Sequence, residues 1–242
     1  MRLQFEQRIY SWQLESLRRE VIRLVGPEQD LYHNHRIDAS GESKGFYYRY
    51  PLIQYKKIGH QASMVGIGAG ADALHSLLTL ADKRVHIEGW EEAQDLRIDK
   101  IRASTASLRI SLDFYRYRIP NWVALNARNF ARYREIEGLS ARIAFLEKLM
   151  QDQMLSLAKG LGFWLQDPVQ VRILQLRRER LVHIKKQPFL AFDLDFSTNL
   201  RLPLYLGLGG KVSKGFGTIL PAARPQEKRP RLLLAGSEGR QS

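Results

Sequence analysis

Two histidines separated by one residue, His33 and His35, are the side chains of this sequence best suited to proton transfer. Residues i and i+2 of an extended segment point the same way, so the two imidazoles can lie side by side. Imidazole titrates at about pH 6.5, and one neutral and one protonated ring therefore coexist near neutrality. Such a pair can deprotonate a ribose 2′-hydroxyl and protonate a departing 5′-oxygen, which is the chemistry of metal-free RNA cleavage.

The residues alone leave two other interpretations of the histidine pair open. Spacings of the His-x-His type also occur in metal sites, and Asp38 is close in sequence, although the chain has no cysteine and no second histidine cluster. The pair can equally belong to a surface loop without function. The remaining histidines are isolated, and we interpret them as surface or satisfied core residues: His60, His75, His86 and His183.

A glycine-rich stretch near the C-terminus, Gly207–Gly217, has five glycines in eleven residues together with Lys211 and Lys214. Backbone N–H groups in such a loop can approach a phosphate chain closely. Val212 stands where a P-loop needs Ser or Thr and where a dinucleotide-binding loop needs its third glycine. We therefore expect Gly209 and Gly210, with the two lysines, to contact a polyanion. A flexible hairpin turn without a ligand is the alternative.

A second basic segment covers residues 171–186, where cations alternate with apolar residues. We predict a β-hairpin here, with Val169–Ile173 and Leu181–Lys185 as its strands. A rigid basic ribbon suits the phosphates of a folded RNA, and an ordinary solvated hairpin is the alternative. The predicted RNA-binding residues of this segment are Arg172, Arg177, Arg178, Arg180, Lys185 and Lys186.

The charge of the whole chain agrees with a polyanionic partner. The formal net charge is +13 over 242 residues. Residues 104–221 carry 18 Lys and Arg against 9 Asp and Glu, whereas residues 1–103 carry 15 against 14. No apolar run reaches the roughly 18 residues of a membrane span, and the N-terminus lacks the apolar core of a signal peptide. We expect a soluble, cytoplasmic protein without membrane contact.

The order of predicted elements indicates an α+β fold. In the first half we expect strands at 3–5, 46–58, 62–67, 85–87 and 96–101, with helices at 14–24 and 71–81. This β-α-β-β-α-β order is that of a ferredoxin-like unit. Residues 108–115 begin the second half as a strand, and an apolar stripe of helical spacing follows from Asn126 to Lys159, interrupted at Gly138. Further strands are expected at 192–196, 204–206 and 216–220.

We therefore predict two tandem ferredoxin-like (RRM-like) domains. The first covers residues 1–103 and contains the His-x-His pair. The second covers residues 104–221 and contains the basic segment and the glycine-rich loop. Residues 222–242 are expected to form a basic, largely disordered tail because they lack apolar periodicity.

Four segments in this order resemble a known family. They are Tyr32–His35, Arg49–Lys56, Pro120–Asn126 and Gly207–Gly217. The last resembles the glycine-rich signature of the RAMP superfamily of CRISPR-associated proteins, and the others look like one branch of its repeat-processing endoribonucleases. The resemblance implies tandem ferredoxin-like folds and a catalytic histidine in this part of the first domain. Tyr47 is an additional candidate for orienting the ribose or phosphate.

The resemblance implies an endonuclease of CRISPR antiviral defence that binds repeat RNA and cleaves precursor crRNA. We expect 2′-hydroxyl attack, 2′,3′-cyclic phosphate and 5′-hydroxyl ends, and no metal or other cofactor. The resemblance also implies that the product stays bound and enters a CRISPR effector complex. Two other classes remain: a non-catalytic RNA-binding subunit of such a complex, and a metal-dependent nuclease. The sequence leaves the oligomeric state open, a homodimer included.

Overall fold

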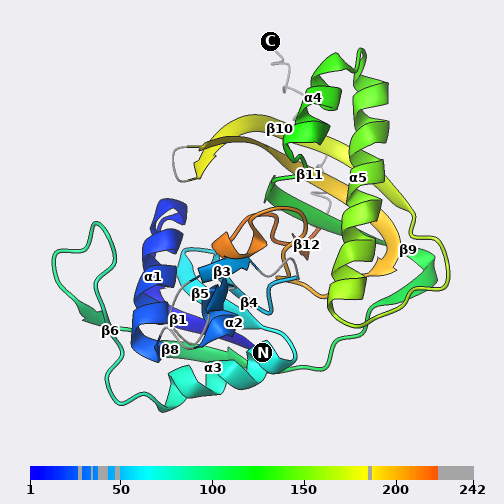
Figure 1. Ribbon diagram of the computed structural model, residues 1–242. Helices are drawn as coiled ribbons and strands as arrows, with labels where there is room; N and C mark the ends of the chain where they lie inside the picture. The colour runs from blue at the N-terminus through cyan, green and yellow to red at the C-terminus, as the bar shows by residue number, and fades with distance from the viewer. Residues whose placement is uncertain (27–28, 34, 38–42, 47–49, 185–186, 223–242) are drawn as a thin grey trace, which may run out of the picture.

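The chain folds around two antiparallel sheets, one in each half of the sequence (Figure 1). The computed structural model describes residues 1–26, 29–33, 35–37, 43–46, 50–184 and 187–222, and from 33 to 46 it describes the backbone only. None of the helices in these residues is both long and apolar enough to cross a bilayer.

The N-terminal sheet has the strand order β4-β5-β1-β8. Its strands are β1 (Arg2–Arg8), β4 (Ile53–Ile58), β5 (Gln61–Gly66) and β8 (Ile98–Arg102), and every neighbouring pair is antiparallel. Helix α1 (Leu14–Val25) follows β1, and α3 (Ala69–Thr79) follows β5. Numbered by their order in the chain, the four strands stand as 2-3-1-4, which is the arrangement of a ferredoxin-like unit.

Short elements are inserted into this first unit. The 3-10 helix η1 (Ser11–Gln13) links β1 to α1, and α2 (Asp30–His33) follows α1. Strands β2 (His35–Ile37) and β3 (Ser43–Phe46) pair as a small separate ribbon, and β6 (Arg84–Val85) pairs with β7 (Gln94–Asp95). Pro51 precedes β4 instead of lying inside a long strand, which corrects the strand predicted over residues 46–58. A proline cannot donate to a sheet ladder, so β4 begins after it.

The C-terminal sheet has the equivalent order β10-β11-β9-β12. Its strands are β9 (Arg109–Trp122), β10 (Val171–Ile184), β11 (Gln187–Arg201) and β12 (Leu220–Pro221). Helices α4 (Ala127–Glu135) and α5 (Leu139–Gly160) connect β9 to β10. Between β11 and β12, where a ferredoxin-like unit has its second helix, residues 202–219 form the glycine-rich loop with one 3-10 turn, η2 (Val212–Lys214).

Two predicted helix boundaries of the second unit are confirmed. Asn126 caps α4, since its side-chain oxygen accepts the N–H of Asn129 at 2.8 Å. Gly138 separates α4 from α5 with a φ of 81°, a conformation that side chains disfavour. The predicted apolar stripe is buried along most of its length, at Tyr133, Leu146, Met150, Met154 and Leu157. Leu139 is 64% exposed, because the turn between α4 and α5 projects past the sheet (Figure 1).

The hairpin predicted over residues 171–186 is wrong. Residues 171–184 form one strand, β10, whose partner is β11, in the register Val171↔Thr198 to Ile184↔Gln187. The polar run Arg177–Arg180 lies inside the strand because carboxylates on β11 face it. The strands predicted at 204–206 and 216–220 are likewise not formed as expected. The described residues there have only an isolated bridge, Gly207↔Thr218, and the short strand β12. The tail from residue 223 lies outside the described residues.

Candidate nucleic-acid interface

The histidine pair follows a well-anchored tyrosine. Tyr32 is 1% exposed; its hydroxyl donates to the carbonyl of Ala73 on α3 at 2.7 Å. The carbonyl of Tyr32 accepts the hydroxyl of Tyr55 on β4 at 3.4 Å. These bonds fix the backbone immediately before His33 to the core of the N-terminal unit.

The two histidines do not share one extended segment, which corrects the geometry assumed from their spacing. His33 is the last residue of α2, and His35 is the first residue of β2, where it pairs with Phe46. The chain therefore changes conformation between them, and the i, i+2 rule for strands does not apply. The side chains of both histidines, and Tyr47 altogether, lie outside the described residues.

Strand β4 has two buried faces with different partners. Ile53 and Tyr55 belong to the core of the N-terminal unit. Gln54 and Lys56 point the opposite way, toward the glycine-rich loop of the other unit. The Gln54 side-chain oxygen accepts the N–H of Gly207 at 2.9 Å, and the Lys56 ammonium donates to the carbonyl of Val212 at 3.4 Å. One strand thus holds both the histidine segment, through Tyr55, and the glycine-rich loop.

Tyr50 adds a third contact between the units. Its hydroxyl donates to the carbonyl of Gly207 at 2.7 Å. Both peptide groups on either side of Gly207 are therefore fixed by residues from the N-terminal unit. Tyr50, Gln54 and Lys56 all belong to the segment Arg49–Lys56 that resembled the RAMP family, and holding the loop is a structural role for that segment.

The glycines of the loop allow it to pack against the end of β9. A Cβ on Gly209, whose φ is 91°, would lie 2.8 Å from both the Trp122 indole nitrogen and the carbonyl of Val123. Gly210 donates its N–H to that same carbonyl at 2.8 Å. A Cβ on Gly217 would lie 2.1 Å from the carbonyl of Leu208. A side chain at Gly209 or Gly217 would therefore disturb the loop itself, before any effect on a ligand.

The two lysines of the loop contact protein groups as well as solvent. Lys211 is exposed and has its ammonium 5.0 Å from the centre of the Phe189 ring on β11. Lys214 forms an ion pair of 2.9 Å with Glu15 on α1. Lys214 therefore joins the two units, while Lys211 remains on the surface beside the β10–β11 hairpin.

The buried ammonium of Lys56 gives the interface a testable pH dependence. Burial lowers the pKa of Lys56 from its ordinary value of 10.5 to about 7. Between these values the unfolded chain binds one more proton than the folded chain, so the free energy of unfolding rises with pH by up to about 1.4 kcal/mol per unit. Below about pH 7 both states are protonated and this contribution to the slope disappears.

We expect a Lys56→Met variant to lose this slope. Measured by urea denaturation between pH 7.5 and 9.5, the stability of the wild type should rise more steeply with pH than that of the variant. Lys57→Met is the matched control, because Lys57 lies next in the strand and its ammonium bonds only to the carbonyl of Gly59 among the described contacts. Equal slopes for wild type and Lys56→Met would contradict the buried-ammonium account.

The cations of β10 lie on the open face of the C-terminal sheet. Arg177 bonds to a carboxylate oxygen of Asp195 through Nε at 2.9 Å, and this bond raises the pKa of Arg177. Arg180 pairs with Asp193 at 3.6 Å and bonds to the side-chain oxygen of Asn121. Arg172 and Arg178 are exposed, and Lys185 and Lys186 lie outside the described residues. Two of the predicted RNA ligands are thus also held by aspartates of β11.

Two further arginines on this face escaped the sequence analysis. Arg116 and Arg118 of β9 alternate with Tyr115, Tyr117 and Ile119, which pack into the core. In register, Ser197 of β11 stands between Arg172 and Arg116, so these two side chains share a face. The alternation of Arg and Tyr over residues 115–118 was the signal that could have found them. We call this surface the arginine face: Arg116, Arg118, Arg172, Arg177, Arg178 and Arg180.

The arginine face and the glycine-rich loop are contiguous. Asn121, which bonds to Arg180, accepts the N–H of Gly217 at its carbonyl at 3.1 Å. Six arginines on the face are only partly balanced by Asp193 and Asp195, so its potential is positive. Figure 1 shows the glycine-rich loop, in orange, between the two sheets. A series of hydrogen bonds therefore connects the arginine face to the loop, and the loop to the buried strand that anchors the histidine segment.

Comparisons with known proteins identify the family. A family model described as the Cas6b N-terminal domain matches residues 1–106, and one described as the Cas6b C-terminal domain matches residues 109–222. This chain belongs to the Cas6b family. A protein of Methanocaldococcus jannaschii, called "Uncharacterized protein MJ0978", is 33% identical over 106 residues, which are 44% of this chain and 70% of that protein.

Solved structures agree with this Cas6b assignment. A structure described as "Crystal structure of Cas6b" is 26% identical and has a TM-score of 0.79, covering 92% of this chain and 100% of its own. A second, described as "CRISPR RNA processing endoribonuclease Cas6b", is 24% identical with a TM-score of 0.63 and the same coverage. The RAMP resemblance and the two tandem ferredoxin-like folds predicted from sequence are both confirmed.

Proposed function

We propose that this Cas6b chain is an endoribonuclease that binds CRISPR repeat RNA and cleaves precursor crRNA once within each repeat. The proposal rests on one structural observation above all: β4 anchors the histidine segment on one face and the glycine-rich loop on the other. The loop continues into the arginine face. A bound RNA on that surface is thereby placed within the same rigid framework as the two histidines.

The two units have different tasks in this proposal. Residues 1–103 carry out the chemistry through His33 and His35, with Tyr47 orienting the ribose or phosphate. Residues 104–221 grip the RNA through the arginine face and the glycine-rich loop, and the basic residues 222–242 add to the attraction for RNA. The product remains bound and passes to a CRISPR effector complex. Lys185 and Lys186 add two further positive charges to this grip.

The reaction is an internal transesterification. One imidazole takes the proton of the 2′-hydroxyl, and the oxygen attacks the adjacent phosphorus. The bond from phosphorus to the 5′-oxygen breaks, and the second, protonated imidazole gives its proton to that oxygen. The products are a 2′,3′-cyclic phosphate and a 5′-hydroxyl. Because the nucleophile belongs to the substrate, the reaction has no need of a metal-bound hydroxide.

The test is cleavage of an end-labelled repeat RNA with and without EDTA. We expect one cut at the same position and the same rate in both conditions. The downstream product should have a 5′-hydroxyl end, so a ligase that requires a 5′-phosphate should not join it unless a kinase has phosphorylated it first. Loss of cleavage in EDTA, restored by a divalent cation, would identify a metal-dependent nuclease. Tight binding without cleavage in either condition would identify a non-catalytic RNA-binding subunit.

RNA affinity should depend on salt through the arginine face. We expect Arg116→Glu, Arg172→Glu and Arg178→Glu each to weaken binding, and each lost phosphate contact to flatten the plot of log affinity against log salt by roughly 0.7 to 0.9. Single-turnover cleavage at saturating protein should change little, because these residues lie away from the histidine segment. The measurement is a salt titration of affinity for one repeat RNA.

Lys148→Glu is the matched control for this titration. It makes the same change of charge on α5, where Lys148 pairs with Asp152 and both side chains are more than half exposed, so that solvent screens the repulsion between the two carboxylates. Arg177 and Arg180 are less suitable for charge reversal, since Asp195 and Asp193 would then each face a second carboxylate. If the three arginine variants keep the slope of the control, RNA is held on another surface.

A further inference from the structure

Two aromatic side chains, Tyr10 and Trp12, stand exposed beside the proposed RNA surface without a role in the chemistry described so far. They flank the start of η1, between β1 and α1. Their rings are parallel within 7°, with centroids 6.3 Å apart. Tyr10 is 68% exposed and Trp12 is 57% exposed. Large rings are usually buried in a folded domain, so an ordered exposed pair marks a contact surface.

The backbone beneath the pair is held firmly. Gln13 is 3% exposed; its side-chain oxygen accepts the N–H of Tyr10 at 2.8 Å, and its side-chain nitrogen donates to the carbonyl of Glu88 at 2.7 Å. Ile9 donates its N–H to the carbonyl of His60 at 2.9 Å. Ordering the rings on a ligand therefore requires little loss of backbone entropy.

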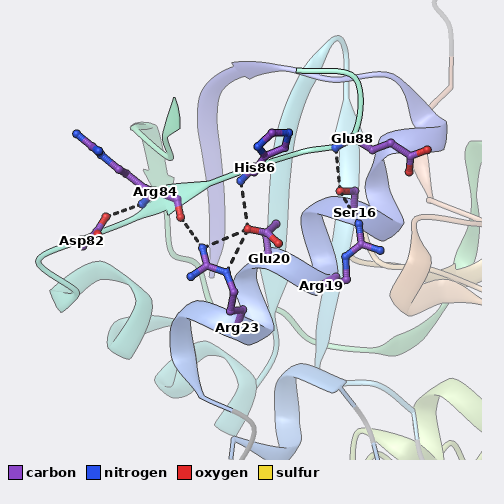
Figure 2. A network of polar contacts seen from close by, with 8 residues as sticks. All are labelled: Ser16, Arg19, Glu20, Arg23, Asp82, Arg84, His86 and Glu88. Atoms are coloured by element: carbon purple, nitrogen blue, oxygen red, sulfur yellow. Dashed lines mark hydrogen bonds and ion pairs between the residues drawn. The ribbon is translucent and has the colours of Figure 1, made fainter. Parts of the chain in front are cut away.

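A polar network joins α1 to the segment 84–88, which directly precedes Gly89 (Figure 2). Ser16 on α1 accepts the N–H of Glu88 at 3.0 Å, and Glu20 accepts the N–H of His86 at 3.1 Å. Arg23 donates to the carbonyl of Arg84 at 2.8 Å. These bonds fix the segment 84–88 along α1 and so place Gly89.

Gly89 is the residue on which the indole rests. A Cβ at this position would lie 2.8 Å from Cη2 of Trp12, so the ring edge touches the glycine backbone directly. The network of Figure 2 holds the segment that precedes Gly89, and Gly89 in turn lies against the indole.

The pair is continuous with the glycine-rich loop. A Cβ on Gly215 would lie 2.5 Å from Cδ1 of Leu14, and Lys214 pairs with Glu15. The residues directly after Trp12 therefore contact the loop that we place on the RNA. Lys211 extends the same loop to Phe189 on β11.

Charges around the pair favour contact with bases over contact with phosphates. Arg8, which faces Gln61 in register, and His60 are exposed cationic or titratable groups on the β1 and β4–β5 side. Exposed carboxylates occur on the other side, in the segment that carries Gly89: Glu88, Glu91 and Glu92. Phosphates are therefore attracted toward Arg8 and repelled from the Gly89 segment, which leaves the uncharged faces of nucleobases to meet the rings.

We propose that Tyr10 and Trp12 form a stacking platform for unpaired bases of the RNA that flank the part held by the arginine face. The inference rests on the proposed function, since it assumes repeat RNA as the ligand. Stacking on aromatic side chains tolerates any base and contributes substantially to single-strand binding. The ligand class is single-stranded RNA with accessible base faces, and the platform adds affinity without reading sequence.

The experiment compares two RNAs and three variants of the full chain. One RNA is the part of the repeat protected by the bound protein, and the other adds unpaired nucleotides on both sides. We expect the wild type to bind the extended RNA about 10-fold more tightly, which lies within the range for one or two stacked bases. Trp12→Ala and Tyr10→Ala should reduce or abolish this difference and leave affinity for the shorter RNA unchanged. Trp164→Ala is the matched control, because Trp164 is 83% exposed on the other unit.

Two further measurements test whether stacking on the rings causes the difference in affinity between the two RNAs. Trp12→Phe should retain most of the gain, since a ring remains, and abasic sites in the flanks should remove the gain from the wild type. Thermal melting of each variant establishes that it is folded. If Trp12→Ala and Tyr10→Ala keep the full difference between the RNAs, the platform is overturned and the pair is a surface for something else, such as a protein. Absence of repeat binding by the wild type would instead overturn the proposed function.

Discussion

Replacement of either His33 or His35 by alanine should slow single-turnover cleavage of repeat RNA by about 10²- to 10⁴-fold, the usual contribution of a general acid or base. Affinity for the same RNA should change little, because in our proposal the arginine face of the other unit makes the grip. The measurement is the cleavage rate at saturating protein, together with a binding titration of each variant.

The matched control is His60→Ala. His60 is an exposed residue of the same unit, in the turn between β4 and β5 and outside the histidine segment. Its replacement should leave the cleavage rate unchanged. The wild type should show a bell-shaped dependence of rate on pH, and each active-site variant should lose one limb. Wild-type rates in both His33→Ala and His35→Ala would remove these residues from the mechanism.

A single 2′-deoxyribose at the scissile nucleotide should abolish cleavage altogether. Without the 2′-hydroxyl there is no internal nucleophile, and no alternative attack is provided by a pair of imidazoles. The modified RNA should bind as tightly as the unmodified one, because we propose that the arginine face holds phosphates, which the modification leaves unchanged. The comparison uses the same RNA with the deoxyribose moved one nucleotide away, which should be cut at the normal rate.

Normal cutting of the scissile-site analogue would contradict internal attack. It would indicate that water is the nucleophile, and the product would then end in a simple phosphate instead of a 2′,3′-cyclic phosphate. This result is separable from loss of the histidines, since it changes the substrate and leaves the protein intact.

The elements that depend on local signals were predicted well. The apolar spacing of α1 and its end at Gly26, the start of the next helical region at Asn126 and the break at Gly138 are all set by neighbouring residues. Strand β10 was predicted as two strands because Arg177–Arg180 is polar. Its actual partners, Asp193 and Asp195, are on another strand, and only that long-range pairing makes the run compatible with a sheet.

The site was predictable only where it depends on local sequence. The glycine-rich loop and the histidine pair can be recognised from their residue types and spacing, but their mutual placement depends on β4. A glutamine and a lysine at 54 and 56 resemble the solvated face of an edge strand, and they become buried only because a loop from the other unit covers them. Arg116 and Arg118 were missed because the strand was predicted to end at residue 115, so the alternation of inward and outward side chains was not extended to them.

The missing second helix of the C-terminal unit has a consequence for how the chain folds. A loop stands in its place, and Tyr50, Gln54 and Lys56 of the other unit hold that loop. The carbonyl of Val212, a residue that is 5% exposed, would lose the Lys56 ammonium if the halves were separated. The two units are therefore thermodynamically coupled and should unfold in a single transition. A different ferredoxin-like module could replace either half only if it supplied the same contacts to the loop.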